Sequence, residues 1–172
     1  MKPGDDLESA IIANLGPGSY TAVVRGVNNT IGTAVVDAYD LSGASPVKLA
    51  NIATRGLIQD GDKLMIAGFI VQNAPVRVVI RAIGPSLLAF GINNALPDTT
   101  LELHDANGLM MKNDDWKSDP AQKQELEETG LNPSHDLEAA LVADIQPGLY
   151  TAQVRGKNDT SGIGVVQIYF LQ

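Results

Sequence analysis

The densest run of polar side chains in the sequence is HDANGLMMKNDDWKSD, residues 104–119. If residues 105–108 form a hairpin turn, the strand that follows carries Asp114 and Asp115 to its far end, next to Asp119. Carboxylate oxygens gathered in this way suit Ca²⁺, which takes six to eight oxygen ligands. The sequence therefore predicts a calcium site at Asp114, Asp115 and Asp119. Asp and Asn are also common in turns because their side chains bond nearby backbone groups, and that interpretation remains open.

Residue types that catalyse hydrolysis are present, but they lack the spacing of catalytic motifs. His104 and His135 are 31 positions apart, and neither belongs to an HExxH pattern. Ser86 lies in GPSLL, which lacks the GxSxG turn that exposes a nucleophile. The sequence therefore predicts no catalytic residue and no enzyme. A hydrolase that uses His104 with Asp114 or Asp115 is the least favoured function.

The overall composition excludes several classes of partner. The net charge is −8, from 20 acidic against 12 basic residues, and the basic residues are scattered singly. A nucleic acid needs a clustered basic face, so we expect no nucleic-acid partner. No apolar run approaches the roughly 20 residues of a spanning helix, so we expect no membrane insertion. The absence of cysteine excludes disulfides and thiolate metal sites.

Candidate residues must be positioned by a chain that contains an internal repeat. Residues 6–41 align with residues 136–171 at a constant offset of 130, without a gap, and 20 of the 36 positions are identical. The segment from residue 42 to residue 171 is also 130 residues long. The pattern predicts two parts of a tandem array: residues 1–41 as a partial repeat, which is a three-stranded meander and the tail of a preceding unit, and residues 42–172 as a complete unit.

Within the complete unit, apolar and polar residues mostly alternate with a period of two, and turn residues interrupt them, which is typical of an all-β protein. One short surface helix is expected near residues 119–130, with Asp119 as its N-cap, Pro120 at its first position and Gly130 at its end. Residues 83–92 are expected to form a packed crossover loop. Eight strands suit an antiparallel β-sandwich, and we predict them at residues 47–54, 63–71, 76–83, 100–104, 109–112, 137–145, 150–155 and 164–170.

The two copies of the repeat differ in polarity. Val23 and Val27 in the first copy replace Gln153 and Lys157 in the second, so one face of the first copy is more apolar. A meander without the rest of its unit also exposes strand edges, which recruit other strands. We therefore predict an interface at Val23 and Val27, and self-association through residues 6–41.

Four motifs carry a family resemblance: LANIATRG (49–56), GFIVQNAPVRVVIRAIGPSL (68–87), LPDTTLELHDANGLMMKNDDW (96–116) and PGLYTAQVRGKNDTSGIGVVQIY (147–169). They resemble a repeat module of large secreted or surface proteins of environmental bacteria. More distantly, they resemble the bacterial pre-peptidase C-terminal domain. This resemblance implies a jelly-roll-like β-sandwich, which is appended to secreted hydrolases as a non-catalytic accessory module; related collagen-binding modules carry Ca²⁺. It also implies a secreted or cell-surface location.

Together these observations favour a non-catalytic extracellular module that binds a polysaccharide, a protein or a surface, or that spaces domains in a tandem array. The alternative is an assembly module that exchanges strands between molecules. Calcium is the only cofactor that the residues suggest.

Overall fold

The computed structural model describes residues 3–41 and 49–171. The chain divides into two compact units, Met1–Lys48 and Leu49–Gln172, which are described separately. No helix in the described ranges is both long enough and apolar enough to cross a membrane.

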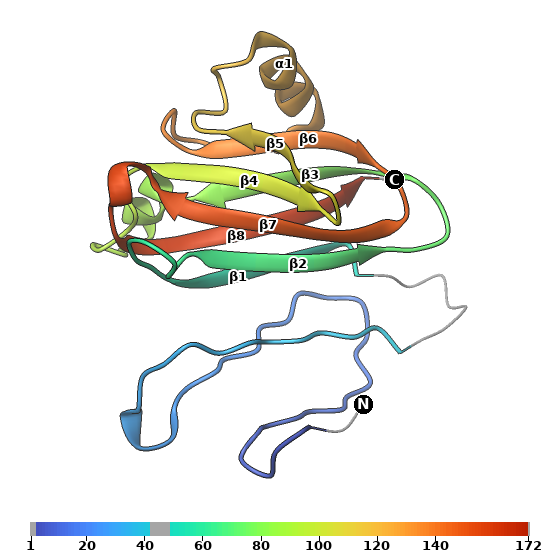
Figure 1. Ribbon diagram of the computed structural model, residues 1–172, viewed down its shortest axis with the longest axis vertical. Helices are drawn as coiled ribbons and strands as arrows, with labels where there is room; N and C mark the ends of the chain where they lie inside the picture. The colour runs from blue at the N-terminus through green and yellow to red at the C-terminus, as the bar shows by residue number, and fades with distance from the viewer. Residues whose placement is uncertain (1–2, 42–48, 172) are drawn as a thin grey trace. The chain divides into compact units, whose positions relative to one another are not determined.

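The second unit contains eight strands in two four-stranded sheets (Figure 1). One sheet, here called sheet A, has the strand order β1-β8-β3-β6, and the other, sheet B, has the order β2-β7-β4-β5. Every pair of neighbouring strands is antiparallel. The strands are β1 (Asn51–Ile58), β2 (Met65–Val71), β3 (Val76–Ile83), β4 (Thr99–Asp105), β5 (Gly108–Asn113), β6 (Ala139–Ile145), β7 (Gly148–Gly156) and β8 (Gly162–Leu171).

This architecture is the predicted antiparallel β-sandwich, and its strand order is that of a jelly roll. All eight predicted strands are present, although the first begins at Asn51, where residues 47–54 were expected; residues 47 and 48 lie outside the described part of the chain. Only the turn between β4 and β5 forms a hairpin, and there Gly108 has a positive φ of 120°. The other consecutive strands lie in different sheets or do not pair with each other.

The core fills the space between the two sheets. In β7, the alternate residues Tyr150, Ala152 and Val154 are buried, while the residues between them face outward. Phe69 of β2 stacks on Tyr150 with ring centroids 5.5 Å apart, and it meets Phe170 of β8 edge-on at 6.1 Å. The period of two in the sequence thus becomes one buried and one exposed face for each sheet.

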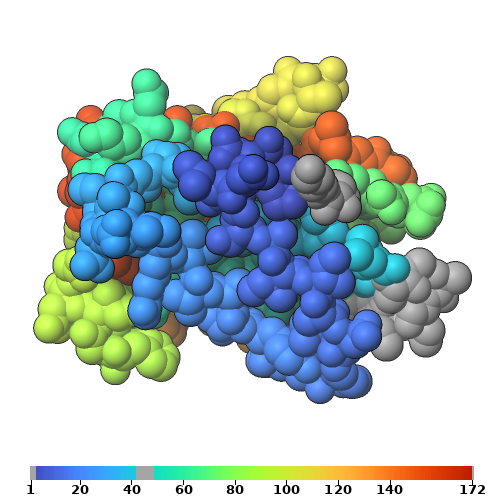
Figure 2. All heavy atoms as spheres, turned by 90° about the horizontal axis from the view of Figure 1, so that it is seen from below, coloured from blue at the N-terminus to red at the C-terminus, as the bar shows by residue number. Residues whose placement is uncertain are grey.

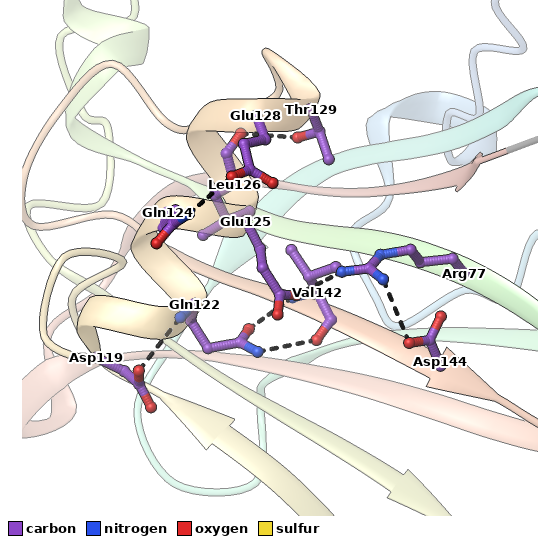
Figure 3. A network of polar contacts seen from close by, with 10 residues as sticks. All are labelled: Arg77, Asp119, Gln122, Gln124, Glu125, Leu126, Glu128, Thr129, Val142 and Asp144. Atoms are coloured by element: carbon purple, nitrogen blue, oxygen red, sulfur yellow. Dashed lines mark hydrogen bonds and ion pairs between the residues drawn. The ribbon is translucent and has the colours of Figure 1, made fainter.

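Helix α1 (Pro120–Thr129) follows the expected capping pattern and packs on the outer side of sheet A. Gly130 ends it with a φ of 67°, and Leu126 is fully buried. The side-chain amide of Gln122 accepts a hydrogen bond from the backbone N–H of Val142 and donates one to its carbonyl, at 2.8 and 3.2 Å (Figure 3). Because β6 is an edge strand, these bonds satisfy backbone groups that would otherwise invite another strand.

The crossover at residues 83–92 is packed only in part. It contains a 3₁₀ helix, η2 (Pro85–Phe90), in which Pro85 and Leu87 are buried. Leu88 and Phe90 are exposed, although the apolar sequence predicted a fully packed loop.

The predicted three-stranded meander is not formed in either copy of the repeat. In residues 136–171, the strands β6, β7 and β8 alternate between the sheets, so β6 pairs with β3, β7 pairs with β2 and β4, and β8 pairs with β1 and β3. In residues 3–41 no strand is present, and η1 (Val27–Asn29) is the only helical turn (Figure 1). Figure 2 shows the atoms of this segment as an open, looped chain. Its assignment as the tail of a preceding unit stays a prediction.

Candidate metal site

Three strands of sheet B bring charged residues together at one end of the sheet. Asp98 comes directly before β4, and Asp114 and Asp115 come directly after β5. Because β4 and β5 are antiparallel and Leu101 lies opposite Asn113, the start of one strand lies beside the end of the other. Strand β7 pairs with β4 on the other side, so Lys157, which follows β7, arrives at the same place.

The three carboxylates, here called the acidic triad (Asp98, Asp114 and Asp115), surround one ammonium group. Each carboxylate has an oxygen that lies within 4.8 Å of an oxygen of both others. The Nζ atom of Lys157 lies 2.7 Å from Oδ2 of Asp114, 3.8 Å from Asp98 and 3.9 Å from Asp115. One positive charge therefore faces three negative charges.

The second oxygen of each carboxylate is buried without a hydrogen-bond donor. Oδ1 of Asp98, Oδ1 of Asp114 and Oδ1 of Asp115 are shielded from solvent, and none accepts a hydrogen bond. Buried carboxylate oxygens without partners are costly, because they lose their hydration and gain nothing in return. The donor set consists of hard oxygens only, which fits a divalent cation such as Ca²⁺.

The electrostatics of the triad agree with this shortage of positive charge. Burial raises the pKa of Asp98 above its usual 3.8, the neighbouring carboxylates add to the rise, and Lys157 opposes it. The hydrogen bond to Asp114 and the surrounding carboxylates raise the pKa of Lys157. The site thus favours a bound positive charge, and it disfavours the ionised form of Asp98 beside the two other carboxylates.

Two of the three predicted ligands, Asp114 and Asp115, belong to the triad. The third, Asp119, does not. Its Oδ1 caps α1 by accepting hydrogen bonds from the backbone N–H groups of Ala121 and of Gln122, the second of which Figure 3 shows. Asp98 takes its place. The sequence held a signal for Asp98, since extending the antiparallel register of the predicted hairpin places the residues before its first strand beside Asp114 and Asp115. Metal binding by these residues stays a prediction.

The residues considered for catalysis have structural partners. Nε2 of His104 lies 3.0 Å from Oε2 of Glu102, and Nδ1 of His135 accepts a hydrogen bond from the backbone N–H of Leu137. In residues 3–41 and 49–171, no hydrogen bond joins either histidine to Ser86, whose hydroxyl bonds Glu138 and Ser134. The pairing of His104 with Asp114 or Asp115 is not formed, because His104 lies opposite Leu109 at one end of β4, whereas Asp114 and Asp115 follow Asn113, which lies opposite Leu101 near the other end.

Ser86 belongs to a buried network that fixes the crossover. Glu138 is fully buried, and its Oε1 accepts hydrogen bonds from the backbone N–H groups of Gly84 and Ser86. Its Oε2 accepts one from Oγ of Ser86, at 2.7 Å. This carboxylate therefore holds η2 against the start of β6, which is a structural role.

The predicted interface residues Val23 and Val27 are exposed in the first unit. Their role as an interface stays a prediction.

A scan against models of known protein families finds no match to this chain, and a comparison with curated proteins finds none. Among solved structures, the chain is similar to the pre-peptidase C-terminal domain of collagenase from Bacillus anthracis, with a TM-score of 0.43 and 14% sequence identity. The similarity covers 69% of this chain and 88% of that domain.

Proposed function

We propose that residues 49–171 form a non-catalytic accessory module of a secreted or surface protein, and that Ca²⁺ bound by the acidic triad stabilises it. The observation that supports this proposal is the set of three buried carboxylate oxygens without partners, one each from Asp98, Asp114 and Asp115.

A bound Ca²⁺ would stabilise the end of sheet B. It would take oxygens from the residues that precede β4 and follow β5, and so hold the two ends together. Lys157 would turn away as the ion enters, because its side chain is one-third exposed and its four-carbon stem is flexible. The chemistry supplied by the ion is charge neutralisation, and no reaction is proposed.

The extracellular and accessory part of the proposal rests on the sequence motifs of residues 49–169. A binding partner would be a polysaccharide, a protein or a surface. The outer face of sheet B offers an apolar patch for such contact, since Ile70 lies opposite Leu149 and both are exposed, as is Ile66 on the same face. A glycan array and a cell-wall pull-down would test it, and two blank results would remove the binding half of the proposal.

The calcium half is tested by thermal unfolding of the full chain with Ca²⁺, with Mg²⁺ and with a chelator. A ligand that binds only the folded state stabilises it by about 2.7 kcal/mol at a concentration of 100 Kd. We therefore expect Ca²⁺ to raise the midpoint by several degrees over the chelator, and Mg²⁺ to raise it less, because Mg²⁺ demands a stricter octahedral geometry.

The matched variants are Asp98→Asn and Asp119→Asn. Asp98→Asn removes a proposed ligand and should abolish the calcium shift. Asp119→Asn should keep the shift, because Asn also caps helices well and Asp119 lies outside the triad. Equal midpoints in Ca²⁺ and chelator, or a shift that survives in Asp98→Asn, would contradict the proposal.

A further inference from the structure

The two copies of the repeat share their local backbone geometry in detail. Asn28 and Asn158 both have positive φ, at 53° and 54°. The hydroxyl of Tyr20 donates a hydrogen bond to the carbonyl four residues earlier at 2.8 Å, and that of Tyr150 does the same at 2.8 Å. The first copy thus has the turns of the β6–β8 segment, although it forms no strands.

The positions that fill the core in the second copy are retained in the first. Val154 and Val166 are 0% and 1% exposed, and their counterparts Val24 and Val36 are also valines but 59% and 58% exposed. The same holds for Ala152, which is buried and matches Ala22. Residues 6–41 therefore carry the inward-facing residues of a sandwich that they do not enter here.

Gly162 and its counterpart Gly32 also have the same residue type in different surroundings. At Gly162 an added Cβ would lie 2.6 Å from the backbone of Leu96, so the sandwich requires glycine there. At the matching Gly32 there is open space, and no local contact accounts for a glycine. The retained glycine fits a docked position of the first copy, not its undocked one.

The first copy cannot form such a sandwich alone. In the second copy, β6, β7 and β8 do not pair with one another; every partner strand belongs to β1–β5. Residues 6–41 can bury their apolar side chains in the same way only against five strands equivalent to β1–β5, here called a front.

We propose that residues 6–41 are equivalent to the segment β6–β8 and form its three strands when they meet a suitable partner. That partner is the front of another unit of this fold, and not the front formed by β1–β5 of the same chain.

The front in this chain fits the first copy poorly. Gly164 lies against Ile58, and an added Cβ would come within 2.7 Å of Cδ1 of Ile58, which is fully buried. The first copy has Ala34 at that position. Ile168 fills the core at 1% exposure, and the smaller Ala38 would leave a cavity there.

The electrostatic fit is also poor. Phe170 meets Phe69 edge-on, and the first copy would place the carboxylate of Asp40 there. At the acidic triad, the first copy would place Val27 where Lys157 supplies the only ammonium within reach of the three carboxylates among the described residues. The front that accepts residues 6–41 therefore differs from this one at these contacts.

Cysteine cross-linking in the full chain tests the proposal without background, because the chain has no cysteine. Arg55 of β1 lies opposite Val165 of β8, and Val35 is the matching valine of the first copy. The pair Arg55→Cys and Val165→Cys should cross-link. The pair Arg55→Cys and Val35→Cys should not, either within one chain or between two. A cross-link of the second pair as complete as the first would overturn the proposal, because this front would then accept the first copy.

A second variant tests whether residues 6–41 are a strand set at all. Gly162→Val blocks docking of the second copy, while Ala34→Gly, Ala38→Ile, Asp40→Phe and Val27→Lys give the first copy the contacts that this front requires. In this background, Arg55→Cys should now cross-link to Val35→Cys, and amide exchange should slow in residues 6–41. The end of β8 lies beside the start of β1, since Tyr169 is opposite Asn51, so a first copy docked in the same way would also end beside the start of β1.

The control adds Gly32→Val, which should abolish that cross-link because it blocks the first copy in the same way. No cross-link in the fitted variant, or one that survives Gly32→Val, would overturn the proposal. These outcomes are independent of calcium, so they separate this inference from the proposed function.

Discussion

Residues 6–41 and 136–171 are nearly the same sequence in two different situations. Both have the turn with positive φ at the first asparagine and the tyrosine bonded four residues back. Among the described residues, only the second copy has strands, and each of them pairs with strands of β1–β5. The difference shows that 36 residues of sequence suffice to set the turns, whereas the strands need partners that lie elsewhere in the chain.

The comparison also shows which residues should stabilise the second unit by being buried. Equivalent residues, such as Val24 and Val154, have the same chemistry and opposite burial. Substitutions at matched positions should therefore change the free energy of unfolding in one copy and not in the other.

The largest difference is expected at the matched glycines. Gly162→Val should destabilise the second unit by about 3 kcal/mol, because its side chain must push against the backbone of Leu96. Gly32→Val should stay within about 0.5 kcal/mol, because it meets open space. Urea unfolding of the full chain measures both. Equal losses would mean that the first copy is packed as tightly as the second.

A smaller difference is expected at the matched valines. Val154→Ala should cost about 2 kcal/mol, from two lost methyl groups and the cavity that they leave. Val24→Ala should cost less than about 0.5 kcal/mol. The midpoint of urea unfolding reports the change, and a comparable loss at Val24 would show that this side chain is buried in solution.

The smallest effect on stability is expected at the matched positions Lys157 and Val27. Burial raises the pKa of Asp98 and Lys157 lowers it, so Lys157→Val should raise that pKa further. A carboxyl group whose folded pKa lies above its unfolded value of 3.8 costs stability at higher pH, and the cost disappears as the pH falls to that value. In chelator, Lys157→Val should therefore lower Tm at neutral pH, and the deficit should shrink on acidification.

The reverse change, Val27→Lys, is the matched control, and it should leave Tm unchanged at every pH. If the Tm of Lys157→Val stays below that of the unchanged protein by the same amount down to pH 3.8, the triad does not cause the loss.

Much of the fold was predictable from local patterns. The helix follows from Asp119, Pro120 and Gly130, which satisfy or end the backbone hydrogen bonds at its two termini. The eight strands follow from alternating apolar residues. The error concerned pairing: consecutive strands joined by short turns were expected to lie side by side, but β6, β7 and β8 cross between sheets. Alternation shows that a strand has one buried face, and it does not show which sheet holds it.

The residues of the candidate site were likewise predictable only in part. Asp114 and Asp115 were predicted because they are adjacent in the sequence and follow a hairpin, and both belong to the triad. Asp98 was missed because it joins them through strand register, and Asp119 was included although its carboxylate is used by the helix. Lys157 was missed as well, because it comes to the triad through the pairing of β7 with β4.

The sequence by itself determined what short-range forces control: the turns with positive φ, the capped helix, the alternating faces of the strands and the repeat. The tertiary structure alone decided the sheet partners, the membership of the triad and the different fates of the two copies. Those features depend on contacts between segments far apart in the chain. A strand gains its hydrogen bonds and buries its apolar face only when such a partner is present.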